Sequence, residues 1–152
     1  MLFAILFSIF SLTANFVQER AVSLMKEPQM SEGILTYKKP NYLKWEYTSP
    51  SNLIWEIDGE KGNVNKQVRG LVELIMKSVS GEIFEFNTDF DIKQENNIYI
   101  LKPQKREYKQ LMENITIILN PKTNIADEVI ILEKNGDTTK IKFSNVTFEV
   151  DE

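Results

Sequence analysis

Apolar and polar residues alternate along most of the chain, and this two-residue period predicts β-strands. Leu43, Trp45 and Tyr47, for example, alternate with Tyr42, Lys44 and Glu46, and a Ser-Pro-Ser-Asn turn follows. Because short turns separate the alternating runs, we expect an antiparallel meander with its aromatic residues gathered on one face. The expected strands cover residues 15–24, 29–39, 42–47, 53–58, 89–94, 98–101, 115–119, 128–133 and 139–150.

One internal segment has a helical period instead. From Gln67 to Ser80 the apolar residues recur every three or four positions, which predicts an amphipathic helix, and Gly81 is a suitable stop signal. The residues that follow this spacing are Val68, Leu71, Val72, Ile75, Met76 and Val79.

The late strands are apolar on both faces, which predicts that both faces are covered. Ile115 and Ile117 alternate with Thr116 and Ile118, and residues 128–133 show the same feature. One helix is little material for a sheet of eight or more strands. Either the sheet curls on itself, or part of its apolar face is left for another partner. A curled sheet capped by helices could hold an apolar ligand. The alternative is an ordinary filled core, which the pattern alone favours.

The N-terminal residues allow two interpretations. Met1 to Phe10 is an apolar run like the core of a signal peptide, with Ala14 as a possible cleavage point, but no basic residue precedes it. The run is also too short to cross a bilayer, which takes about 20 residues. Alternatively, Phe3, Leu6, Phe7 and Phe10 lie on one face of a helix. Residues 1–14 are therefore expected to be a helix or the remnant of a targeting segment.

Composition excludes several classes of function. The 152 residues suffice for a single domain, residues 1–152. The formal net charge of −4 argues against a nucleic-acid partner. The chain has no Cys and no His, so it lacks thiol and imidazole nucleophiles and the usual zinc ligands. We therefore expect no metal and no cofactor.

Only two groups of charged residues are candidates for a catalytic or anion-binding site. Glu46, Glu56 and Asp58 lie on neighbouring expected strands, and a hydrolase with paired carboxylates is conceivable. They lie opposite the aromatic residues of their strands, so we expect them to face water. The basic segment Lys102–Lys109 is expected to be a solvated loop rather than a site for an anionic partner. No enzyme signature remains, and the sequence predicts a protein that is not an enzyme.

An ordered set of motifs runs through nearly the whole chain. It begins with Phe16-Val17-Gln18 and continues with Gly33-x-x-x-Tyr37-x-Lys39-Pro40-x-x-Leu43-x-Trp45-Glu46-Tyr47, Pro50, Asp58-Gly59, Leu101-x-Pro103, Glu133-Lys134-Asn135-Gly136-Asp137-Thr138-Thr139 and Phe143-x-Asn145-Val146. This set resembles the LolA family, the periplasmic carriers that bring lipoproteins to the outer membrane. The sequence of residues 42–50 is most similar to LolA-type proteins of Bacteroidota. The resemblance to the family covers about residues 8–148.

The resemblance implies a mainly β (α+β) fold: an open, unclosed antiparallel β-barrel of about 8–11 strands with a helical lid. It implies a periplasmic carrier whose hydrophobic cavity binds the acyl chains of lipoproteins. The expected partners are acylated lipoproteins as cargo, an inner-membrane lipoprotein-releasing ABC transporter and an outer-membrane acceptor, and the carrier is expected to be a monomer. The alternative is a LolA-like module that binds or senses another lipid, or regulates an envelope partner.

The resemblance also indicates site residues. The basic residue before proline, usually Arg in the family, is Lys39 here, and it is expected to help close the lid. The Trp inside the family's barrel corresponds to Trp45. Alternation and helical spacing extend the expected lipid-binding cavity to Leu35, Tyr37, Leu43, Tyr47, Leu53, Trp55, Ile57, Leu71, Val72 and Ile75.

The sequence departs from the family pattern at both ends. Residues 7–15 look like the end of a longer family helix, which is compatible with a true start upstream of Met1, and export is then implied by the family alone. At the other end, family members usually continue beyond the position of Glu152 with a segment that packs near the opening.

Overall fold

The computed structural model describes residues 9–39, 41–80 and 89–150. Within these ranges, ten strands form one antiparallel sheet in the order β5-β4-β3-β2-β1-β10-β9-β8-β7-β6. The sheet is unclosed, which confirms the predicted mainly β class and the open barrel. The strands are β1 (Ile9–Ala21), β2 (Gln29–Lys38), β3 (Tyr42–Ser49), β4 (Leu53–Asp58), β5 (Lys61–Gly62), β6 (Phe90–Glu95), β7 (Ile98–Pro103), β8 (Met112–Leu119), β9 (Ala126–Glu133) and β10 (Thr138–Val150).

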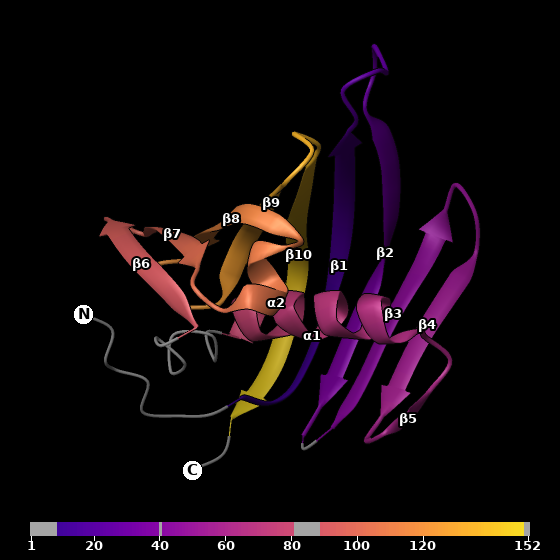
Figure 1. Cartoon of the computed structure of the whole chain (residues 1–152). Coiled ribbons are helices and arrows are strands. Elements are labelled where there is room, and N and C mark those ends of the chain that lie inside the picture. Colours follow the sequence, from indigo (N-terminus) through magenta and orange to yellow (C-terminus); the bar gives the residue numbers. More distant parts are fainter. Residues whose placement is uncertain (1–8, 40, 81–88, 151–152) are drawn as a thin grey trace.

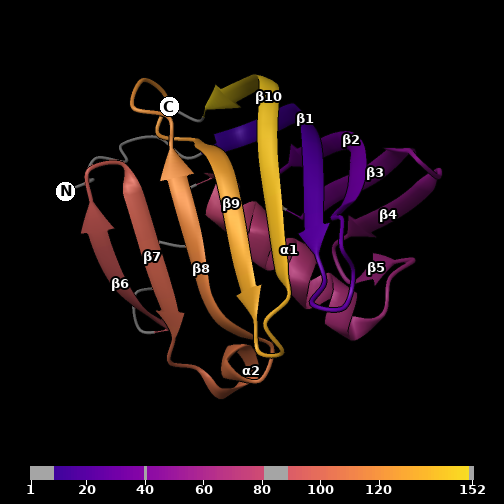
Figure 2. The same cartoon turned by 90° about the horizontal axis from the view of Figure 1, so that it is seen from above.

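Two helices accompany the sheet, α1 (Lys66–Ser80) and the short α2 (Arg106–Lys109). The sheet bends around α1, which crosses its concave side, while α2 lies at the β7–β8 connection (Figures 1 and 2). In the chain, α1 follows the edge strand β5 and precedes the opposite edge strand β6. It is therefore the element that fills the concave side of the open sheet.

Alternation along the strands produces the core. On β1, for instance, Leu12, Ala14 and Phe16 are buried whereas the residues between them are exposed. The prediction that both faces of the late strands are covered is wrong. On these strands the concave face is buried, but Ile118 and Ile130 of the convex face remain partly exposed, because α1 packs only on the concave face.

The N-terminal interpretation also needs correction. Residues 9–14, expected in a helix or in a targeting remnant, form the first half of β1. Their backbones pair with β2 on one side and β10 on the other, and the buried positions follow a period of two. Phe10 lies exposed on this strand. The remaining residues on which the helix was based, Phe3, Leu6 and Phe7, lie outside the described residues, as do Pro40 and Gly81.

Helix α1 is tied to the β4–β5 end of the sheet. The side chain of Asn65 accepts a hydrogen bond from the Val68 N–H at 2.9 Å, which caps the start of the helix. One turn further on, the Arg69 guanidinium donates to the Glu60 carbonyl at 3.0 Å and also to the Gly59 carbonyl. These bonds fix the first turns of α1 beside the β4–β5 turn.

The outer edge of β4 is covered by β5 and by Asn63. β5 pairs with only the last two residues of β4. Beyond it, the Asn63 side-chain amide donates to the Ile54 carbonyl and accepts from the Glu56 N–H, both at 2.8 Å. The Asn63 backbone N–H also donates to the Glu56 carbonyl at 3.2 Å. Asn63 thus occupies hydrogen-bonding groups that an additional strand would otherwise pair with.

Candidate functional site

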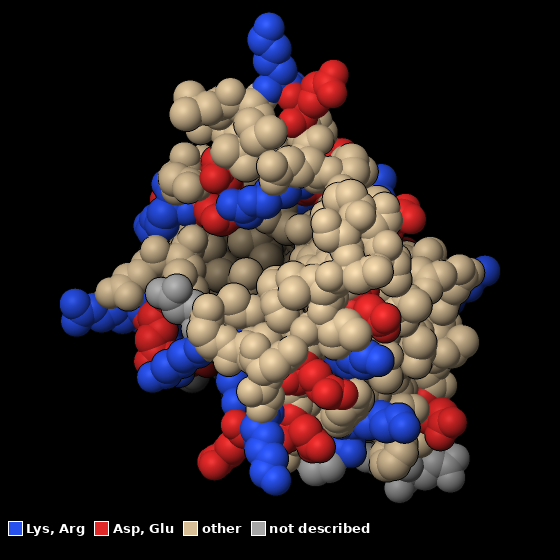
Figure 3. All heavy atoms as spheres, turned by 90° about the vertical axis from the view of Figure 1, so that its right-hand side faces the viewer, with Lys and Arg blue, Asp and Glu red and all other residues tan. Residues whose placement is uncertain are grey.

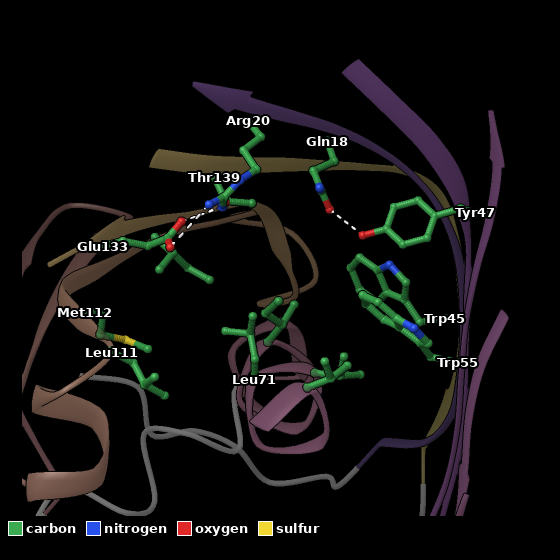
Figure 4. A pocket seen from close by; sticks show the side chains of 14 residues that line it. Gln18, Arg20, Trp45, Tyr47, Trp55, Leu71, Leu111, Met112, Glu133 and Thr139 are labelled. Carbon is green, nitrogen blue, oxygen red and sulfur yellow. Dashed lines mark hydrogen bonds and ion pairs between the residues drawn. The ribbon is translucent and has the colours of Figure 1, made fainter. Parts of the chain in front are cut away.

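A cavity of about 300 Å³ lies between α1 and the concave face of the sheet. Residues from β1, β3, β4, α1, β8, β9 and β10 converge on it, although they are distant in the sequence (Figure 4). Its lining is mostly apolar, with polar side chains gathered at one end. The lining residues are Gln18, Arg20, Trp45, Tyr47, Trp55, Val68, Leu71, Val72, Ile75, Leu111, Met112, Ile131, Glu133 and Thr139.

One wall of the cavity belongs to an aromatic cluster. Trp45 stacks on Phe16 with ring centroids 4.2 Å apart, and Tyr47 meets Phe16 and Trp55 edge to face, each at 5.5 Å. Trp45 is only 2% exposed, and its indole Nε1 is buried. Burial raises the pKa of Tyr47, and the nearby Trp45 N–H acts in the lowering direction. This N–H makes no hydrogen bond of normal geometry among the described residues.

Gly33 allows this cluster to form. Phe16 is on β1 and Trp45 on β3, so β2 lies between them and their backbones are roughly 10 Å apart. Gly33 pairs with Phe16 in register, and a Cβ at this position would lie 2.7 Å from Phe16 Cζ and inside contact distance of the Glu46 backbone. Because Gly33 has no side chain, the Phe16 ring can cross β2 and reach Trp45.

The other side of the cavity is formed by α1 and the loop before β8. Val72 and Ile75 are buried on the side of α1 that lines the cavity, whereas Leu71 of the same helix is 37% exposed at the cavity's edge. Leu111 and Met112 face the aromatic wall from across the cavity (Figure 4). Leu71 and Leu111 thus combine exposure to solvent with a place in the lining, as expected at the opening of an apolar cavity.

Charged and hydrogen-bonding groups gather at one end. Arg20 on β1 reaches across β10 to β9, where its guanidinium pairs with Glu133 at 2.5 Å, and it also donates to the Thr139 hydroxyl at 3.0 Å. Asp137 is 3.5 Å from the same guanidinium. The hydrogen bond to Glu133 raises the pKa of Arg20, so its charge persists at any working pH. Figure 3 shows the surface hollowed beneath a rim of charged side chains.

A second polar pair lies beside this group. The Tyr47 hydroxyl donates to Gln18 Oε1 at 2.9 Å (Figure 4). Burial raises the pKa of Tyr47 above its ordinary value, so the hydroxyl stays protonated and remains a donor.

The structure brings six of the predicted cavity residues together and separates the others. Trp45, Tyr47, Trp55, Leu71, Val72 and Ile75 line the cavity described above. Tyr37, Leu43 and Ile57 instead line a second hollow of about 220 Å³ on the other side of α1, with Met76 and Lys77.

Two further predicted residues line neither hollow. Leu35 is fully buried in the core, and Leu53 is 47% exposed at the first residue of β4. Both have the predicted orientation on their strands, but alternation does not report how far along the strand the helix and the cavity extend.

Lys39, the predicted lid-closure residue, is half-buried directly after β2. Its backbone N–H donates to the Phe10 carbonyl at 2.9 Å, which joins the end of β2 to the start of β1. It is absent from the linings of both hollows. Its role in closing a lid stays a prediction.

No local sequence pattern indicated the polar end of the cavity. Arg20, Glu133 and Thr139 are ordinary polar residues near strand ends, and only the β1-β10-β9 pairing places them together. Gln18 belongs to the Phe16-Val17-Gln18 motif, which was the one available signal. Met112, Ile131, Val68 and Leu111 also line the cavity without having been selected.

The candidate carboxylates do not converge on the cavity. Glu46 pairs with Lys44 at 3.7 Å, and Glu56 accepts a hydrogen bond from Tyr42 at 2.5 Å. In the part of the chain that is described, no group of three acidic side chains is placed to hold a metal ion. The basic segment, expected to be a loop, includes the end of β7 and α2. Lys105, directly before α2, pairs with Glu107 at 3.8 Å.

None of the described helices is long and apolar enough to span a membrane.

Solved structures similar to this chain support the fold. The Pseudomonas aeruginosa MucA/MucB complex contains a chain that superposes with a TM-score of 0.54 at 10% sequence identity, covering 91% of this chain and 51% of that chain. A crystal structure of MucB alone gives a TM-score of 0.52 at 11% identity. This chain thus spans about half the length of the matched MucB chain, and at this identity the likeness concerns the fold alone.

Sequence relatives identify the family. The outer-membrane lipoprotein carrier protein of Francisella tularensis subsp. novicida is 33% identical over 166 residues, which cover 95% of this chain and 74% of that protein. The protein of the same name from Pseudomonas fluorescens is 22% identical over 150 residues, covering 90% and 71%. The family model for the outer membrane lipoprotein carrier protein LolA matches residues 8–151. The chain therefore belongs to the LolA family.

Proposed function

We propose that the chain is a periplasmic lipoprotein carrier that binds acyl chains in the cavity between α1 and the concave face of the sheet. The observation that carries the proposal is the cavity itself, with two tryptophans on one wall and Leu71, Val72 and Ile75 of α1 opposite. Membership of the LolA family supports the same role. The carrier takes lipoproteins from an inner-membrane lipoprotein-releasing ABC transporter and delivers them to an outer-membrane acceptor, without covalent chemistry and as a monomer.

The size of the cavity is suited to reversible binding. Each buried methylene contributes about 0.8 kcal/mol, so several fully enclosed acyl chains would bind too tightly to be released. About 300 Å³ is at the lower end of the range for ligand pockets. We therefore expect acyl chains to be enclosed only in part, with the remainder at the opening formed by Leu71 and Leu111.

A pair of single substitutions on α1 tests the proposal. Leu71→Glu places a carboxylate at the cavity's edge, where it opposes acyl chains. Because Leu71 is partly exposed, the domain should still fold. Gly70→Glu is the matched control, because Gly70 is exposed and a Cβ there would meet open space. Removing one leucine contact of about 1.4 kcal/mol corresponds to a tenfold loss of affinity.

Native mass spectrometry after expression in a periplasm provides the measurement. Wild type and Gly70→Glu should carry acylated lipoprotein, and Leu71→Glu should be largely empty. Equal occupancy of the two variants would contradict the assignment of the cavity. A lipid other than lipoprotein in wild type would support the alternative, a LolA-like module that binds or senses another lipid or regulates an envelope partner. An empty wild-type protein would overturn the carrier role.

A further inference from the structure

The polar end of the cavity gathers hydrogen-bonding side chains beside a mostly apolar lining. Gln18, Arg20, Glu133 and Thr139 lie together there, and Tyr47 joins them from the aromatic wall (Figure 4). The rest of the lining offers apolar contacts. A ligand with one polar and one apolar end would therefore bind in a single orientation, with its polar end toward Gln18.

Gln18 has donors available for a ligand. Its side-chain oxygen accepts the hydrogen bond from Tyr47, which fixes the plane of the amide. The amide nitrogen carries two N–H groups. Among the residues that the structure describes, none accepts a hydrogen bond from this nitrogen. A carbonyl oxygen is the complementary group, since it is an acceptor without charge.

The neighbouring charges disfavour an anionic ligand. Arg20 and Glu133 are the charged residues in the described lining, and they neutralise each other in a direct ion pair. Asp137, which is buried, adds a second carboxylate on the same guanidinium. The local charge is thus neutral to negative, and the donors of Arg20 already point at Glu133, Thr139 and Asp137. A fatty-acid carboxylate or a phosphate would gain little from this arginine and would be repelled by the acidic pair.

From these contacts we propose, on the basis of the carrier function above, that Gln18 binds an ester or amide carbonyl at the head of the acyl chains. The cavity thereby selects a neutral acylated head over a free fatty acid. Tyr47 is the positioning residue that orients the Gln18 amide, and the chains extend from there toward Leu71 and Ile75.

The two tryptophans provide the assay, because both line the cavity and the chain has no others. Lipids with brominated chains quench tryptophan fluorescence on contact. The probes are a brominated diacylglycerol with ester linkages, its dialkyl ether analogue without carbonyls, and a brominated free fatty acid. A neutral hydrogen bond predicts that wild type binds the ester about three- to tenfold more tightly than the ether. The fatty acid should bind more weakly than the ester.

Gln18→Leu should bring the ester and the ether to equal affinity, because the leucine side chain offers no donor to the ester carbonyl. Circular dichroism checks that the variant is folded. Tyr47→Phe should lower the preference in part, because the amide is no longer oriented. Gln104→Leu, an exposed site outside the cavity, is the matched control and should retain the full preference.

A wild-type protein without ester preference, or a Gln18→Leu variant that retains it, would overturn the role of Gln18. Preferred binding of the free fatty acid would overturn the selection for a neutral head. In both cases quenching by the ether would leave the proposed acyl-binding function intact. Absence of quenching by all three probes would instead contradict that function.

Discussion

Replacement of Trp45 separates two contributions of the aromatic wall to stability. Trp45→Ala removes a side chain that is 2% exposed and stacked on Phe16 at 4.2 Å. Trp45→Phe keeps an aromatic ring in the stack but removes the indole N–H, which is buried without a hydrogen bond of normal geometry. Both variants therefore lose the buried indole N–H, but only Trp45→Ala loses the aromatic stack.

The burial of Trp45 sets the expected change in the free energy of unfolding for each variant. Truncation of a buried tryptophan to alanine costs about 3–5 kcal/mol, a large part of the 5–15 kcal/mol that stabilises a typical domain. In Trp45→Phe, the smaller ring fills less of the space, which lowers stability. The substitution also removes a buried donor without a partner, and such a donor costs about 1–3 kcal/mol. The two effects oppose each other. We expect Trp45→Phe to lower the free energy of unfolding by no more than about 1 kcal/mol.

Urea unfolding measures both variants. Trp55 remains as the single tryptophan in each and is excited selectively, and circular dichroism follows the sheet independently. Similar losses for Trp45→Phe and Trp45→Ala would refute the reasoning about the unsatisfied N–H. A loss below about 1 kcal/mol for Trp45→Ala would show that the wall is not part of a packed core. Because Trp45→Ala weakens the core, loss of cargo from that variant alone would say little about the cavity.

Three further predictions concern single positions. Gly70→Ala, in the exposed interior of α1 where a Cβ meets nothing, should raise the free energy of unfolding by about 1 kcal/mol in urea titrations. Gly33→Ala should instead destabilise the domain by more than about 3 kcal/mol, since its Cβ would collide with the β3 backbone and the Phe16 ring, and a stable variant would contradict the described packing. The hydrogen bond to Glu56 raises the pKa of Tyr42 to about 12. In the unfolded chain the tyrosine has its ordinary pKa near 10 and therefore ionises at lower pH than in the folded protein. The free energy of unfolding should consequently fall as the pH rises from about 10 to 12. Unfolding of Tyr42→Phe measured across that range should show a smaller fall, and an equal fall would exclude this tyrosine as the cause.

Much of the fold was predictable because strand alternation and helical spacing are local signals. The prediction for residues 53–58 coincides with β4, and the helix predicted over residues 67–80 matches α1 to one residue. The failure at residues 9–14 has a physical reason. Leu12, Ala14 and Phe16 fit a strand as well as a helix end, and the pairing with β10, more than a hundred residues away, selects the strand.

The site was predictable only where it depends on strand faces. Trp45, Tyr47 and Trp55 share a face and a register, so alternation placed them together. The polar end depends on the adjacency of β1, β10 and β9, which join opposite ends of the chain. No local pattern reports that adjacency, and Arg20 and Glu133 were therefore missed.

Asn63 at the edge of β4 affects whether the protein can aggregate with its neighbours. An unclosed sheet offers edges on which other proteins could form an additional strand and aggregate. With its amide paired to Ile54 and Glu56, Asn63 obstructs that route on the β4 side. The concave side of the sheet can in this way stay open while strand addition is hindered along this edge.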